Sequence, residues 1–175
     1  DKMIEKITKN TPQEYVEKLS EECKKCGNCC SFGSGFILQE EIKKIAEFLD
    51  LTQKELKEKF LKEVEFFNTK QYRVKMEKNQ NLPHGKCAFL LGNKTCAINK
   101  VKPLHCKISN CKDHGDEVQT WFMANYFLNS NDPESIRQYA SYLKTGGRLL
   151  SGAKLGDLVP DKGSLKKILN FERLK

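Results

Sequence analysis

Apolar residues recur at helical spacing in several segments of the chain. In residues 42–49 they follow the i, i+3, i+4, i+7 pattern of an amphipathic helix. Thr11 and Pro12 supply an N-cap and a proline at the first helical position, which predicts a short helix before the first cysteines. Thr52 and Glu55 form a capping-box pair that predicts another helix. We expect this helix to include the apolar positions Leu56, Phe60, Leu61 and Val64.

The rest of the pattern predicts one strand, one loop region and further helices. Apolar and basic residues alternate in residues 72–76, as in a short, half-buried strand. Residues 79–115 are rich in Gly, Pro, Asn, Cys and His without sustained periodicity, which indicates loops. Residues 118–128 are crowded with aromatic side chains, and their helical spacing favours a buried helix of the core over a substrate pocket. Two more helices are expected in residues 132–147 and 164–169.

Composition and charge narrow the class of protein. Hydrophobic residues make up 38% of the 175 residues and charged residues 31%, so we expect one domain with a modest core. The formal net charge is +8, but the lysines are spread along the predicted helices and interleaved with glutamates. This favours a solvated surface over a nucleic-acid or membrane partner. No run approaches the roughly 18 apolar residues that cross a bilayer, and the first residues lack the apolar stretch of a signal peptide, so we expect a cytoplasmic protein.

The cysteines are the strongest chemical signal in the chain. Three interpretations compete: disulfides, thiols of the core and metal ligands. The reducing cytosol disfavours disulfides, and core thiols normally lie in apolar segments, whereas these cysteines lie among Lys, Asn and Gly. We therefore interpret the eight cysteines as metal ligands. They are Cys23, Cys26, Cys29, Cys30, Cys87, Cys96, Cys106 and Cys111.

The spacing of the first cysteines has a geometric reason. Two intervening residues allow a tight turn to direct both sulfurs at one metal, and Gly27 can supply the positive φ of such a turn. The spacing of Cys23, Cys26 and Cys29 matches the cubane-binding run of bacterial ferredoxins, although Cys30 follows at once instead of a later Cys-Pro. Cys29 and Cys30 could serve two metals or flank one cluster. Zinc remains an alternative, because four thiolates also suit its tetrahedral preference.

Several motifs occur here in the order typical of a known family. After the first cysteine run come Leu38 with Glu40 and Glu41, then Cys-Ala-Phe-Leu from residue 87, Cys-Ala-Ile from residue 96 and Pro-Leu-His-Cys-Lys from residue 103. Residues 20–112 thereby resemble the YkgJ-type cysteine-cluster proteins, also described as the zinc- or iron-chelating CxxCxxCC domain. The resemblance implies metal chelation by all the cysteines except Cys111, which lies past the usual motif. The flagellin lysine methylases carry a similar signature, which suggests protein methyl transfer as a distant analogy.

These observations leave three functional hypotheses. The first is an iron–sulfur protein with one [4Fe-4S] cluster, which transfers electrons or supports a partner enzyme. The second is a zinc-stabilised structural or interaction module with a protein partner. The third is a metal-dependent enzyme such as a protein methyltransferase, although no common nucleotide-binding or hydrolase motif is present and no catalytic residue is assigned. We expect supporting or surface roles for His84, His105 and His114.

The expected architecture is mainly α. We predict a small helical domain over residues 1–175, with two cysteine-rich loops organised around a metal centre. Residues 20–112 would form the metal-binding region, and residues 116–175 a C-terminal helical extension that packs on it.

Overall fold

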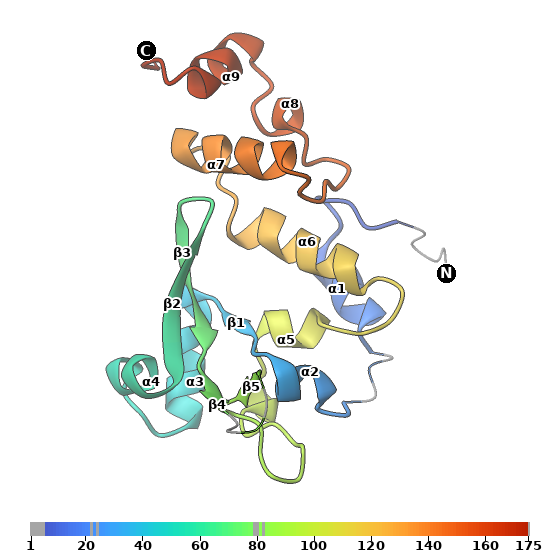
Figure 1. Ribbon diagram of the computed structural model, residues 1–175, viewed down its shortest axis with the longest axis vertical. Helices are drawn as coiled ribbons and strands as arrows, with labels where there is room; N and C mark the ends of the chain where they lie inside the picture. Colours follow the sequence, from blue (N-terminus) through green and yellow to red (C-terminus); the bar gives the residue numbers. More distant parts are fainter. Residues whose placement is uncertain (1–5, 22, 24, 79–80, 82, 175) are drawn as a thin grey trace. The chain divides into compact units, whose positions relative to one another are not determined.

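The computed structural model describes residues 6–21, 23, 25–78, 81 and 83–174 (Figure 1). Helical turns account for 45% of the described residues, and two small sheets accompany them. The chain divides into two compact units. We call residues 20–64 and 71–109 the cysteine unit, and residues 1–19, 65–70 and 110–175 the helical unit.

A helix-rich fold is thereby confirmed, but the structure contains more strands than the one that the sequence predicts. Five strands are present in the described residues. The sequence predicts a single domain, and this depends on how the two units associate, so it stays a prediction. The packing of the C-terminal helices on the metal-binding region also stays a prediction.

The helices of the cysteine unit are short, and α4 (Gln53–Phe60) begins with a local capping box. In α4, the Thr52 hydroxyl accepts from the Glu55 amide at 3.1 Å, and the Glu55 carboxylate accepts from the Thr52 amide at 2.8 Å. This confirms the predicted capping box. The helix predicted from residue 42 is also present, as α3 (Ile42–Phe48). The other helical segments of this unit are α2 (Asn28–Phe32), η1 (Gln39–Glu41), η2 (Asn99–Val101) and α5 (Leu104–Ile108).

The helix predicted to continue past Phe60 ends there, and this part of the prediction is wrong. Leu61 is extended, with φ −117° and ψ 149°, and begins strand β2 (Leu61–Phe66), which also contains Val64. Strand β3 (Thr69–Val74) follows after Phe67 and Asn68, whose φ values of 49° and 57° are those of a tight hairpin turn. Pairing between the strands therefore overrides the helical spacing of Leu61 and Val64.

The strands form two sheets among the described residues. β1 (Phe36–Ile37), β3 and β2 lie in the order β1-β3-β2, and β1 pairs antiparallel with β3. β4 (Met76–Lys78) pairs antiparallel with β5 (Gly85–Cys87), which places Met76 opposite Cys87. The loop prediction for residues 79–115 is therefore wrong for β5, η2 and α5. These elements are too short to show periodicity and depend on tertiary contacts.

One apolar core holds the cysteine unit together, and it reaches the cysteines. Cys87 belongs to it, and Cys30 and Cys96 pack against it. The other buried apolar residues of this core come from α3, α4, the strands and the loop after β5: Ile37, Ile42, Ile45, Ala46, Leu56, Leu61, Val74, Phe89, Leu90 and Ile98.

The helical unit contains the predicted aromatic helix. α6 (Gly115–Tyr126) buries Trp121 and Phe122, which confirms the assignment of this segment to the core. The Trp121 indole donates to the carbonyl of Thr11 at 2.9 Å. The other helices of this unit are α1 (Gln13–Leu19), α7 (Pro133–Lys144), α8 (Leu155–Leu158) and α9 (Lys162–Leu169).

Candidate metal centre

Cysteine thiols from separate segments of the cysteine unit lie close enough to affect one another's ionisation. Burial, together with repulsion from the Cys30 and Cys96 thiolates, raises the pKa of the Cys87 thiol to about 11. Burial also raises the pKa of Cys106, with added repulsion from Cys87 and Cys30. The packing agrees, because Cys30 and Cys96 lie against the core that contains Cys87, and Gly35 lies against the Cys106 sulfur. The converging group, which we call the thiol cluster, consists of Cys30, Cys87, Cys96 and Cys106.

The thiol cluster has the chemistry of a soft-metal site. Thiolates are the ligands that zinc and iron–sulfur clusters prefer, and a bound cation offsets the burial and repulsion that raise the pKa of Cys30, Cys87 and Cys106. The Lys102 ammonium has the same kind of effect as a bound cation, because its positive charge favours the thiolates of Cys30 and Cys106. This effect is smaller than that of burial, so both pKa values stay raised. The donor set therefore fits a metal centre.

Gly27 has the positive φ predicted for the turn in the first cysteine run. Its φ is +71°, in the left-handed region, and it directly precedes α2, which carries Cys29 and Cys30. A Cβ at this position would lie 2.8 Å from the carbonyl oxygen of Lys94, in the second cysteine segment. Gly27 is therefore needed both for the turn and for the close approach of the two cysteine segments.

A second turn holds Cys87 and Cys96 near each other. Leu90 and Cys96 form an antiparallel bridge, and the Ala97 amide donates to the Phe89 carbonyl at 2.8 Å. This hairpin-like closure lies between Cys87 and Cys96, and the charge of the Cys96 thiolate contributes to the raised pKa of Cys87. Cys87 is 7% exposed, so the hairpin anchors one end of the cluster in the core.

Cys106 is carried by α5, and residues 35–41 hold this helix in place. The Glu41 carboxylate accepts from the Leu104 amide at 2.7 Å and from the Leu38 amide at 2.9 Å. Nδ1 of the buried His105 accepts from the Phe36 amide at 3.1 Å. A Cβ on Gly35 would lie 2.2 Å from the Cys106 sulfur. The chain thus passes directly against this thiol.

The remaining predicted ligands occupy different environments. Cys23 and Cys29 belong to the same unit and raise the pKa of Cys30, though less than burial and Cys96 do. Cys26 is exposed. Cys111 is exposed and belongs to the helical unit.

The described residues contain no group of three or more Cys, His, Asp or Glu side chains already placed to hold one metal ion. Assignment of individual cysteines as ligands therefore stays a prediction.

The three histidines have distinct surroundings. His105 uses Nδ1 as a hydrogen-bond acceptor, and its ring centroid lies 4.8 Å from that of Phe36. His84 is exposed, with its ring 5.7 Å from that of Phe32. His114, in the helical unit, lies 3.6 Å from the Glu117 carboxylate. The contact of His105 accords with the supporting role expected for it.

Sequence reasoning missed the supporting roles of Glu41 and Gly35. Glu41 stands in a motif of the resembled family, but its partner Leu104 is 63 positions away. Gly35 carries no positive φ that would mark it as a turn glycine, and its close neighbour is also remote in sequence. No local pattern could have revealed either contact.

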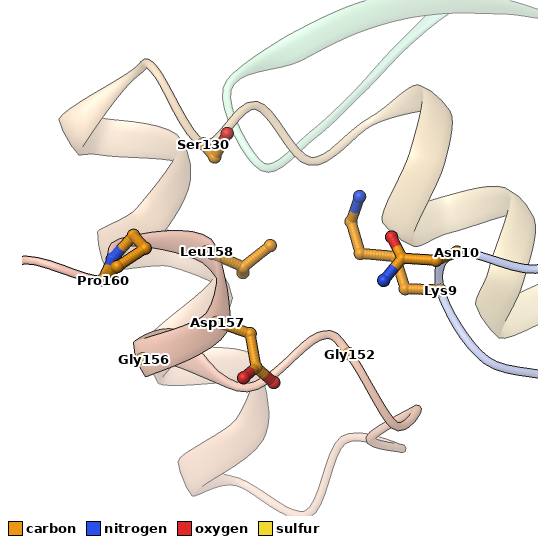
Figure 2. A pocket seen from close by; sticks show the side chains of 8 residues that line it. All are labelled: Lys9, Asn10, Ser130, Gly152, Gly156, Asp157, Leu158 and Pro160. Carbon is orange, nitrogen blue, oxygen red and sulfur yellow. The ribbon is translucent and has the colours of Figure 1, made fainter.

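A cavity of about 530 Å³ lies in the helical unit (Figure 2). Lys9 and Asp157 bring opposite charges to it, and the Asp157 carboxylate also accepts from the Lys154 amide at 3.1 Å. None of its lining residues is a cysteine. They are Lys9, Asn10, Ser130, Gly152, Gly156, Asp157, Leu158 and Pro160.

Comparison with known families agrees with this donor set. The model of the CxxCxxCC family, described as "Putative zinc- or iron-chelating domain", matches residues 22–127. This is more than half of the chain, which therefore belongs to the CxxCxxCC family and contains a metal-chelating domain of this class. The matched region extends through α6, beyond the limit at residue 112 suggested by the motifs. The curated proteins and the solved structures contain no match to the chain.

None of the described helices combines the length and the apolar character that crossing a bilayer requires.

Proposed function

We propose that the cysteine unit holds one [4Fe-4S] cluster, and that the protein transfers electrons or supports a partner enzyme through it. The observation that carries this proposal is that cysteines from α2, β5 and the hairpin after β5 share one core, and that the thiol of Cys106 in α5 is close enough for theirs to affect its pKa. The ferredoxin-like spacing of Cys23, Cys26 and Cys29 supports iron–sulfur chemistry. An iron–sulfur cluster supplies one-electron transfer when it is bound.

Residues of the cysteine unit would shield one part of the metal centre from water and leave another part accessible to a partner. Cys87 lies in the apolar core, which keeps water from this side of the centre. Cys26 and Cys29 are exposed, so another part of the cysteine set reaches solvent. Lys102 places a positive charge near Cys30 and Cys106, where it offsets the negative charge of bound thiolates. A buried side and an exposed side suit electron exchange with a partner protein.

Zinc is the second candidate, and the packing of the thiols favours it. Cys87 belongs to the core, and Cys30 and Cys96 pack against it, as expected where a metal completes a modest core. In this alternative the centre stabilises an interaction module and carries no electrons.

Metal and sulfide analysis separates the two candidates. Anaerobically purified protein should be brown, absorb broadly near about 400 nm, and contain iron and acid-labile sulfide in equal amounts. Colourless protein with stoichiometric zinc would refute the iron–sulfur proposal and support the alternative. Protein that binds neither metal, even after anaerobic reconstitution, would contradict both.

Localisation and partnership belong to the same proposal. Either centre requires reduced cysteines, because disulfide formation would remove the thiolate ligands. We place the protein in the cytoplasm, where thiols stay reduced, with a protein partner that contacts the exposed cysteines.

A further inference from the structure

Residues 35–41 contact α5 at three successive places, and each contact lies close to Cys106. Gly35 lies against the Cys106 sulfur, Phe36 donates to the His105 ring, and Glu41 accepts from Leu104. Strand β1 and α5 are also neighbours in Figure 1. This segment therefore forms a cradle for the helix that carries one member of the thiol cluster.

Glu41 makes the most directional of these contacts. One carboxylate oxygen accepts from the Leu104 amide at 2.7 Å, and the other accepts from the Leu38 amide at 2.9 Å. Leu104 is the first residue of α5, so its amide has no partner within the helix. Pro103, at the N-cap position, makes no side-chain cap hydrogen bond. The Glu41 carboxylate thus replaces the missing cap from a distant part of the chain.

α5 depends on such support because it spans only five residues. A helix of this length is not stable alone in water, and its orientation is set by tertiary contacts. Cys106 lies two positions after Leu104, within the same helical turn. A shift of the first turn therefore moves the Cys106 sulfur as well.

We propose that Glu41 is a positioning residue for the metal centre: its carboxylate fixes the first turn of α5 and so orients Cys106 toward the metal. This inference rests on the proposed metal binding and assigns no ligand role to Glu41. Residues that orient ligands commonly change metal affinity by about 10- to 100-fold when they are replaced.

The decisive variant is Glu41→Gln in the full chain, with Glu40→Gln as the matched control. Glutamine keeps the size of the side chain, but its amide nitrogen cannot accept one of the two hydrogen bonds. Glu40 is an exposed carboxylate one position earlier, so its replacement removes the same charge and keeps the Glu41 side chain that bonds to Leu104. Glu41→Asp serves as a second variant, because it keeps the charge and shortens the reach.

The readout is alkylation of each cysteine by iodoacetamide in metal-loaded protein, followed by mass spectrometry. In Glu41→Gln, Cys106 should be labelled about 10 times faster than in the wild type, while Cys30 and Cys87 stay protected. Metal release to EDTA should accelerate by a similar factor. Glu40→Gln should match the wild type in both measurements. If Glu41→Gln does not fold, the same selective labelling is expected of Glu41→Asp.

Two results would overturn the inference. Equal labelling of Cys106 in wild type and variant would show that Glu41 does not orient it. Equally accelerated labelling of all the cluster cysteines would show a general loss of the fold. A wild-type protein that contains no metal would instead contradict the proposed function, so the two failures are distinguishable.

Discussion

Substitution of Gly35 by alanine tests the metal centre most directly. The added Cβ would lie 2.2 Å from the Cys106 sulfur, whereas nonbonded atoms of this size need about 3.5 Å or more. The φ of Gly35 lies outside the left-handed region, so alanine fits the backbone itself. The substitution therefore acts on the thiol, which must move by more than about 1 Å.

A displacement of this size matters because metal–sulfur bonds are short. Zinc–sulfur bonds are about 2.3 Å long and tolerate deviations of only about 0.2 Å, so Cys106 would leave the coordination sphere unless the chain adjusted. We expect Gly35→Ala to weaken metal binding by at least about 10-fold. Overpacking should also lower the free energy of unfolding by about 1–3 kcal/mol.

Gly33→Ala is the matched control, because its Cβ would meet the carbonyl oxygen of Cys29 at 3.7 Å, an ordinary contact. Metal content, metal release to a chelator and thermal melting should be measured for wild type and both variants. Gly33→Ala should retain the wild-type metal content and release rate. If Gly35→Ala behaves like Gly33→Ala in all three assays, Cys106 is not a ligand held against this glycine.

Three further predictions follow from the same structure. Cys106→Ser should lose more metal than Cys111→Ser, because only Cys106 belongs to the thiol cluster; equal losses in elemental analysis would argue for two separate four-cysteine sites. Metal removal should lower the helical circular dichroism and abolish cooperative melting, since thiolate sites commonly contribute folding free energy on the order of 10 kcal/mol; an unchanged melting curve would give the apolar core that role. Hydrogen bonds from Thr52 hold the pKa of Glu55 below its ordinary 4.5, so their stabilisation is full above pH 4.5 and is lost as the pH falls through the lowered pKa. Acid unfolding of Thr52→Ala should accordingly lack this contribution, and identical acid transitions would refute the assignment.

The boundary between α4 and β2 shows that the periodicity of apolar residues is not sufficient to predict where a helix ends. The capping box at Thr52 is local, and the sequence predicted it correctly. Leu61 and Val64 fit a helical face, yet they lie in a strand, because pairing with β3 and the turn at Phe67 and Asn68 outweigh a weak local preference. The residue at which a helix ends therefore depends on the tertiary contacts of its last turn.

In the cysteine set, too, some features follow from the local sequence and others from tertiary contacts. Cysteine type and spacing determined metal chelation, and the positive φ of Gly27 followed from the turn that such spacing needs. The supports of the site were not predictable, because Glu41 and Leu104 are 63 positions apart and meet only after folding.

By itself, the sequence determined the capped helices, the aromatic helix of the core and the soft-metal donor set, since each depends on residue type at short spacing. The tertiary structure decided which thiols converge, which segment holds α5 and where the helical pattern gives way to a hairpin. These outcomes depend on burial and on contacts between segments remote in sequence, and no local pattern records such contacts.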